Sequence, residues 1–232
     1  AGLLPGSLIH IGKTYAEKSK MTLMRYDEAD LVEKELISVD QLREEKDQKG
    51  LLWVNIDGLQ DVALLEDVGN LFGLHPLILE DILNTDQRPK IEDLTDYIYI
   101  VLRNFDNHES DTLFSEQVSI ILGKNFVLSF QEKDSVLFDA VQERLRRNKG
   151  KIRKAGGDYL VHALIDNIVD NYFILLEDME DRIEKLEDDL VKQTSPAKLQ
   201  AIHVLKRDLI FLRKSLWPLR ETISSLQRSD SP

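Results

Sequence analysis

The sequence predicts an α/β fold: a three-layer α/β/α sandwich with a mixed sheet, followed by a long antiparallel coiled-coil hairpin of two helices. Up to about residue 148, short strand-like and helix-like segments alternate, as in a sheet covered by helices. Beyond residue 157, apolar residues recur at alternating steps of three and four, the spacing of helices that wrap around each other. A basic stretch at 144–154, followed by two glycines, separates the two patterns. We therefore expect an α/β/α domain at 1–157 and a helical hairpin at 158–232.

The first part of the chain supplies the strands of this sheet and the helices that cover it. Strands are expected at 8–11, 22–26, 31–37, 51–56, 97–105, 113–122 and 126–130. Helices are expected at 38–48, 61–72, 76–83 and 136–147. Gly73 ends one helix and Pro76 begins the next, because proline lacks the N–H that the first turn leaves unpaired. Residues 123–125 suit a tight hairpin turn, and residues 106–111 connect the two strands before it.

Two long helices are expected in the second part of the chain. The first ends near residue 193, and its apolar seam consists of Leu176, Met179, Ile183, Leu186 and Leu190. The second begins at Ser195-Pro196, and its seam consists of Ile202, Leu205, Leu209, Leu212, Leu216, Leu219, Ile223 and Leu226. The short joint between them favours an antiparallel hairpin. Pro218 removes a helical hydrogen bond and should kink or interrupt the second helix.

Composition and missing motifs exclude several classes of protein. The formal net charge of −12 argues against nucleic-acid binding, which needs a basic surface. There is no cysteine, so disulfides and thiol chemistry are excluded, as suits a cytoplasmic protein. No signal peptide opens the chain and no apolar run reaches the ~20 residues of a membrane helix, so we expect it to be soluble. The five histidines lack a zinc-binding spacing, and no phosphate-binding loop or nucleophile turn occurs, so we expect no enzyme and no catalytic or cofactor-binding residue.

Several separate motifs resemble one known family. They are His75–Leu83 (HPLILEDIL) running into Gln87–Lys90 (QRPK), Glu116–Ser119 followed by Phe130–Glu132, Asp158–Leu160, Ile168–Phe173, and Trp217–Glu221 (WPLRE). In this order and at this spacing they resemble the cytoplasmic domain of CorA-type magnesium and cobalt transporters, over roughly residues 51 to 228. The first fifty residues match less distinctly.

The resemblance implies a homopentamer on the cytoplasmic face of the cell membrane. Each copy would carry an α/β/α domain, a helical hairpin, and a stalk helix leading to two membrane helices joined by a Gly-Met-Asn loop. We expect that membrane part to lie outside this chain, which makes the chain a soluble fragment that conducts no ions by itself. The implied partners are further copies of the chain, divalent cations, and the membrane through a C-terminal segment.

Three carboxylates are candidate metal ligands. Magnesium prefers oxygen ligands and retains much of its water, so one or two carboxylates suffice. Glu80 and Asp81 are adjacent on an apolar helix, about 100° apart, so they cannot easily hold one ion together but can meet carboxylates of another subunit. The resemblance implies that Asp81, Glu80 and Asp166 line regulatory sites for Mg²⁺ between subunits. From the residues alone, Glu80 and Asp81 are ordinary acids of a helix surface.

The leading hypothesis is a domain that senses cytoplasmic Mg²⁺ between subunits and thereby gates transport of Mg²⁺, with Co²⁺ as the second ion. A first alternative is a structural scaffold, supported by the long heptad pattern, that sets the number of subunits and senses no metal. A second alternative keeps the architecture and changes the ion, because a related branch of the family transports zinc.

Overall fold

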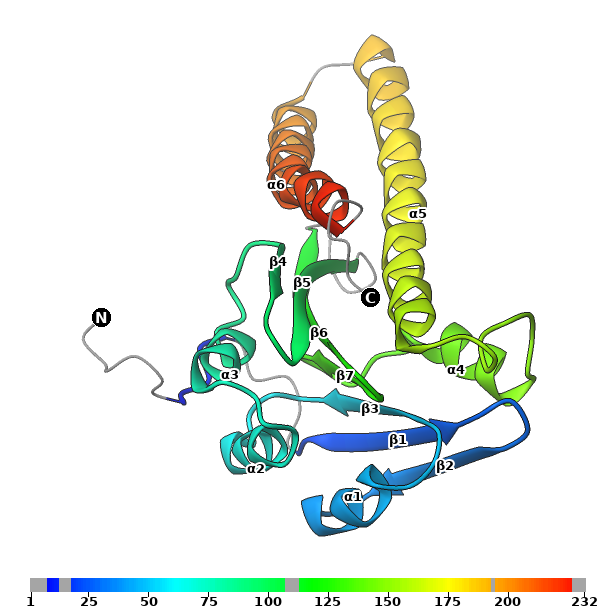
Figure 1. The fold of residues 1–232 in the computed structure, drawn as a ribbon. Helices are drawn as coiled ribbons and strands as arrows, with labels where there is room; N and C mark the ends of the chain where they lie inside the picture. Colours follow the sequence, from blue (N-terminus) through cyan, green and yellow to red (C-terminus); the bar gives the residue numbers. More distant parts are fainter. Residues whose placement is uncertain (1–7, 13–17, 107–112, 193–194, 227–232) are drawn as a thin grey trace.

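The computed structural model describes residues 8–12, 18–106, 113–192 and 195–226, and Figure 1 shows their arrangement. Seven strands form one sheet in the order β2-β1-β3-β7-β6-β5-β4. Their bounds are β1 Lys20–Tyr26, β2 Leu31–Leu36, β3 Leu51–Asp57, β4 Lys90–Asp93, β5 Tyr97–Asp106, β6 Phe114–Gly123 and β7 Phe126–Gln131. Only the central pair β3 and β7 is parallel, and the other neighbours are antiparallel. The sheet is therefore mixed, as expected.

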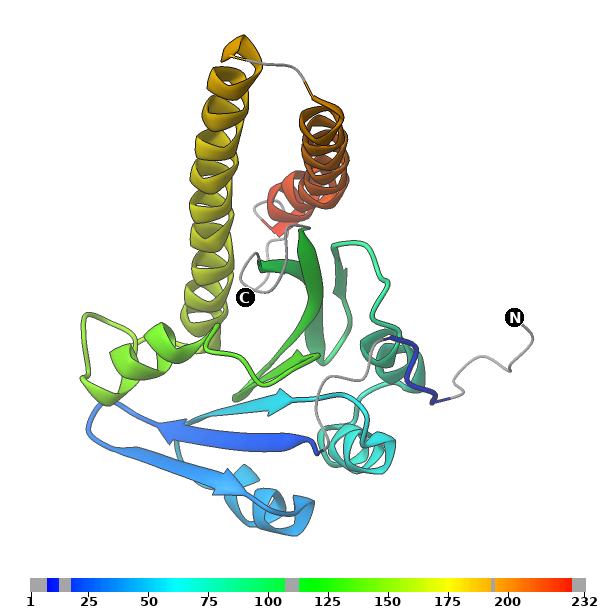
Figure 2. The same cartoon turned by 180° about the vertical axis from the view of Figure 1, so that it is seen from behind.

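Helices cover both faces of the sheet. The helices α1 Val39–Lys46, α2 Val62–Phe72 and α3 Pro76–Leu83 lie on one face, and α4 Asp139–Arg146 and the start of α5 Gly157–Lys192 lie on the other (Figure 2). The central strand β3 shows why both faces need cover. Leu52, Val54 and Ile56 are buried in the core beneath α2 and α3, whereas Trp53 is buried in the core beneath α4 and α5. Alternation along the strand thus produces the predicted three layers.

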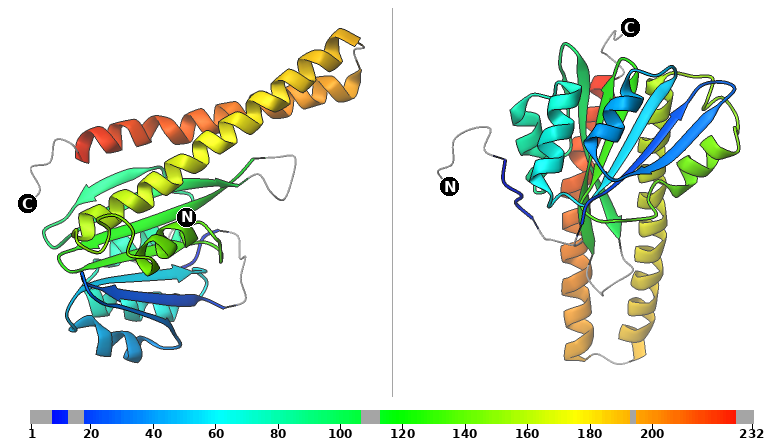
Figure 3. Two further views of the ribbon diagram at one scale, coloured as in Figure 1. Left: turned by 90° about the vertical axis from the view of Figure 1, so that its right-hand side faces the viewer. Right: turned by 90° about the horizontal axis from the view of Figure 1, so that it is seen from below.

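The two long helices form the predicted hairpin. α5 is followed by α6 Pro196–Leu226, and Figure 3 shows the pair extending beyond the sheet. The first turns of α5 pack on the sheet through Leu160, Leu164 and Ile168, which are fully buried. By length and composition α5 is also apolar enough over Gly157–Asp188 to cross a membrane. These buried contacts account for part of that apolar character, because 39% of the most apolar window is buried inside the protein, whereas Phe173 and Ile174 are exposed.

The seam of the hairpin differs from the predicted one at two positions. Leu175 is 5% exposed, whereas Leu176 is 41% exposed and lies outside the core. On α6, Asp208 is 3% exposed and Leu209 is 38% exposed. After buried Leu205, the next buried residue of the seam is therefore Asp208, three residues later. The predicted residue was Leu209, four residues later. The heptad pattern was right, but its assignment at Leu176 and Leu209 was wrong.

Most other elements agree with the sequence prediction to within a few residues, and three differences remain. The segment 8–11 is not a strand, because only Ile11 forms a bridge, to Asn84. β4 was not predicted. α6 continues through Pro218, so the helix is not interrupted there. Some predictions fall outside the described residues. These are most of the connection 106–111, the end of the first long helix at Gln193, and the side chains of Leu219, Ile223 and Leu226 in the seam. The division into domains 1–157 and 158–232 stays a prediction.

Candidate metal-binding site

Helix α3 carries two of the three candidate ligands, and its own sequence fixes its position. His75 caps it, since Nδ1 accepts a hydrogen bond from the backbone N–H of Leu77 at 3.2 Å, and Pro76 occupies the first turn. Ile78, Leu79, Ile82 and Leu83 are all buried against the sheet and α2. These four contacts fix the position of α3, and the two acids lie on its remaining surface, as does Leu77, which is 45% exposed.

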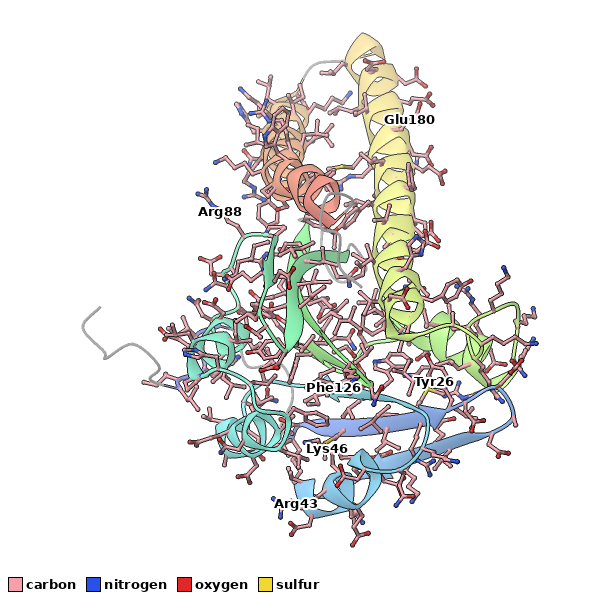
Figure 4. All side chains as sticks on the ribbon, viewed as in Figure 1. Tyr26, Arg43, Lys46, Arg88, Phe126 and Glu180 are labelled. Atoms are coloured by element: carbon pink, nitrogen blue, oxygen red, sulfur yellow. The ribbon has the colours of Figure 1, made fainter. Side chains whose placement is uncertain are left out.

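Asp81 is held by two partners from the segment that follows α3, Gln87 in the turn and Lys90 at the start of β4. Nζ of Lys90 lies 2.6 Å from Oδ2 of Asp81, and Nε2 of Gln87 donates to Oδ1 at 2.9 Å. The side chains of Lys90 and Asp81 are 29% and 25% exposed, so the pair is accessible from solvent but not fully solvated. Arg88, in the same turn, points away from the domain in Figure 4. Of this segment, only Lys90 places a cation on Asp81.

Lys90 has a second carboxylate and an aromatic ring within reach. Its Nζ lies 2.5 Å from Oε1 of Glu92 and 5.5 Å from the centroid of the Tyr99 ring. Burial lowers the pKa of Lys90, but hydrogen bonds to Asp81 and Glu92 outweigh this effect and leave that pKa raised. Lys90 therefore remains a cation at neutral pH.

Gln117 of β6 supports the site from inside the protein. It is 1% exposed, and its Nε2 donates to the backbone carbonyl of Asp81 at 3.0 Å. Its Oε1 accepts from the backbone N–H of Gln87 at 3.2 Å. One buried amide thus joins the end of α3 to the turn that carries Gln87 and leads to Lys90 at the start of β4. The roles of Gln87, Lys90 and Gln117 were not predicted from the sequence, although all three lie in the motifs that indicated the family.

The structure does not bring the three candidate ligands together in one copy. Asp81 and the partly buried Glu80 lie on α3, while Asp166 lies exposed on α5, on the opposite face of the sheet. Within the described ranges, no group of three or more His, Cys, Asp or Glu side chains could hold a metal ion. The accessible carboxylate of Asp81 suits a hard cation such as Mg²⁺ but provides only part of a site.

Comparison with known proteins identifies the family. The family of CorA-like Mg²⁺ transporter proteins matches residues 48–232. The chain belongs to the CorA family. The cobalt/magnesium transport protein CorA of Thermotoga maritima is 45% identical over 232 residues, which are all of this chain and 66% of that protein. CorA proteins are transporters, so the expectation that the chain is not an enzyme is confirmed. The resemblance of its motifs to the CorA family is confirmed as well.

Other relatives extend the comparison. The soluble domain of CorA from Methanocaldococcus jannaschii has the same fold, with a TM-score of 0.72 at 20% identity over 91% of this chain and 80% of that one. The zinc transport protein ZntB of Yersinia enterocolitica is 29% identical over 177 residues, which are 75% of this chain and 50% of ZntB. The chain thus spans half to two thirds of the length of these curated relatives.

Proposed function

We propose that this chain is the cytoplasmic regulatory and assembly domain of a divalent-cation transporter that carries Mg²⁺ and Co²⁺. Mg²⁺ bound between copies at Asp81 would favour the closed state of the transporter. The proposal draws on the cobalt/magnesium transport protein of Thermotoga maritima, which is 45% identical along the whole of this chain. It places the domain at the cytoplasmic face of the membrane.

The observation that carries the proposal is the position of Asp81 and Asp166 on helices that cover opposite faces of the sheet. Two different faces that bind each other produce a head-to-tail contact, and such contacts close into a ring when the rotation permits. In a ring of five copies, α3 of one copy would meet α5 of the next. Each contact would then combine Asp81 and Glu80 from one copy with Asp166 from its neighbour.

The electrostatics of such a contact support control by a cation. A divalent ion between the carboxylates offsets their repulsion, and its departure leaves like charges facing each other. A sensor of cellular Mg²⁺ needs only millimolar affinity, about 4 kcal/mol per site. One or two carboxylates and retained water are a sufficient set of ligands for that affinity.

Limited proteolysis of the full-length protein during a Mg²⁺ titration tests the proposal. We expect millimolar Mg²⁺ to protect the wild type, and Asp81→Asn and Asp166→Asn to need clearly more Mg²⁺ for the same protection. Asp40→Asn is the matched control, because Asp40 carries the same charge and its side chain is 87% exposed on α1. Full protection of Asp81→Asn at the wild-type Mg²⁺ concentration would contradict the proposal.

Two other functions remain to be separated by experiment. The helical hairpin supports a scaffold that sets subunit number without sensing metal, and neutral substitutions at Glu80, Asp81 and Asp166 together would then leave transport regulation intact. The similarity to ZntB supports a zinc-transporting version of the same domain. Uptake measurements with Mg²⁺, Co²⁺ and Zn²⁺ in competition distinguish that version.

A further inference from the structure

The carboxylate of Asp81 is already occupied by a cation from its own chain. Oδ2 accepts from Lys90 at 2.6 Å and Oδ1 accepts from Gln87 at 2.9 Å, so each oxygen has a donor. Each oxygen keeps a second lone pair, so a metal ion can approach this carboxylate, but it then lies close to the ammonium group of Lys90. Charge makes Lys90 the main competitor, since two cations repel each other at one carboxylate.

Lys90 keeps another carboxylate partner when it is displaced from Asp81. An ammonium group carries three donors, and that of Lys90 already reaches Glu92 at 2.5 Å while lying over the Tyr99 ring. Its release from Asp81 therefore leaves it neither unpaired nor far from the site. This arrangement allows exchange between two cations without unfolding of the turn.

We propose that Lys90 is a tethered counter-cation, which neutralises Asp81 when Mg²⁺ is absent and sets the Mg²⁺ concentration at which the site fills. This inference rests on the proposed function, because it assumes that Asp81 is the metal ligand. Lys90 has two effects on the assembly. It weakens Mg²⁺ binding by competition, and it limits repulsion around Asp81 in the metal-free state.

Removal of the charge on Lys90 has two measurable consequences. In Lys90→Gln, the Mg²⁺ concentration for half-maximal protease protection should fall by about two- to fivefold, the range expected for loss of one partly exposed ion pair. Without Mg²⁺, the same variant should be cleaved faster than the wild type, because Asp81 then lacks its counter-cation. A merely structural role for Lys90 would accelerate cleavage at every Mg²⁺ concentration and would not lower the midpoint.

A matched control exists at the other edge of the sheet. Nζ of Lys34 on β2 lies 2.5 Å from Oε1 of Glu45, so Lys34→Gln removes an ion pair of similar length and the same charge far from α3. Lys90→Met is a second neutral variant that retains the aliphatic stem beside Tyr99, in case the glutamine variant does not fold. Lys90→Arg keeps the charge. All variants are compared as full-length protein, with thermal unfolding in EDTA as the check on folding.

The titration decides between the outcomes. A lower midpoint in Lys90→Gln or Lys90→Met, with Lys34→Gln and Lys90→Arg no lower than the wild type, supports the proposal. An unchanged or higher midpoint in the neutral variants, or an equal decrease in Lys34→Gln, overturns it. If Mg²⁺ does not protect the wild type, the proposed function itself fails. If Asp81→Asn loses protection while Lys90→Gln keeps the wild-type midpoint, the inference about Lys90 alone is wrong.

Discussion

Nε2 of Gln117 lies 3.0 Å from the backbone carbonyl oxygen of Asp81, so a buried residue of β6 fixes the end of the helix that carries the candidate ligand. The same side chain accepts from the backbone of Gln87, one of the two partners of the Asp81 carboxylate. Strand β6 therefore orients both the carboxylate and the turn that neutralises it.

Gln117→Leu should lower the free energy of unfolding by about 1–3 kcal/mol. The substitution removes the partner of the Asp81 carbonyl in α3 and of the Gln87 N–H in the following turn, and unsatisfied backbone groups of this kind are costly. Urea unfolding at pH 7 measures the effect. Gln48→Leu is the control, because Gln48 is exposed and a change there should stay within about 0.5 kcal/mol. Equal stability of the two variants would show that Gln117 does not anchor α3.

Asp208→Leu should stabilise the chain. Asp208 is 3% exposed on α6, and its Oδ2 has no hydrogen-bond partner in the part of the chain that the structure describes. Its Oδ1 is 3.8 Å from Nε of Arg207, whose side chain is 64% exposed and gives little compensation. Replacing a poorly paired buried charge by a well-packed apolar residue should raise the free energy of unfolding by about 1–2 kcal/mol. A lower melting temperature in a thermal scan would show that the carboxylate is compensated in another way.

Asp57 should make stability depend on pH. It is 5% exposed at the end of β3, and burial raises the pKa of its carboxyl group from 3.8 to about 7, although Asn55 and Gln131 donate to it. Between about pH 4 and 7 the folded state keeps a proton that the unfolded state has released. The free energy of unfolding contributed by Asp57 therefore falls as pH rises through this window and is constant above it.

Urea unfolding of the wild type and Asp57→Asn at pH 5 and pH 8 checks this dependence. The wild type should lose on the order of 2 kcal/mol more than the variant between the two pH values. The quantity to compare is the change in the free energy of unfolding between the two pH values in each protein. The other titrating groups contribute equally to both changes, and a loss of hydrogen bonds in the variant affects both pH values alike. Equal changes in the two proteins would mean that Asp57 titrates near its ordinary pKa.

Gly69→Ala should destabilise the contact between α2 and α3. A Cβ atom on Gly69 would lie 2.5 Å from Cδ1 and 2.9 Å from Cδ2 of Leu79, which is buried. Overfilling of a core typically costs about 1–3 kcal/mol. The double variant Gly69→Ala/Leu79→Val should lose less stability than the sum of the single variants, because the smaller side chain makes room. Additive losses in urea unfolding would indicate that α2 and α3 simply move apart.

The sequence predicted α3 to the residue, because Pro76 and the apolar run Leu77–Leu83 determine a helix locally. It did not predict β4, since Lys90–Asp93 is short and mostly polar and becomes a strand only through pairing with β5. The hairpin shows a similar effect. The heptad pattern of leucines predicted that Leu209 is buried in the seam, but Asp208 is buried there, and a carboxylate does not contribute to an apolar pattern.

The candidate site was predictable only in part. Asp81 and Glu80 could be placed on α3, and their adjacency already indicated that a single helix would not complete a metal site. The contacts of Asp81 with Lys90 and Gln87, and the support from Gln117, depend on where β6 lies relative to α3. Such long-range register does not follow from local pattern. The roles of Asp81, Glu80 and Asp166 as ligands stay predictions.

A structure of the full-length protein determined in Mg²⁺ and again in EDTA tests the central claim most directly. With Mg²⁺, we expect density for an ion within about 5 Å of the Asp81 carboxylate, near Asp166 of an adjacent copy, with Lys90 turned towards Glu92. In EDTA, Lys90 should return to Asp81. An Asp81 that keeps Lys90 in both conditions, remote from any ion and from every other copy, would contradict the claim.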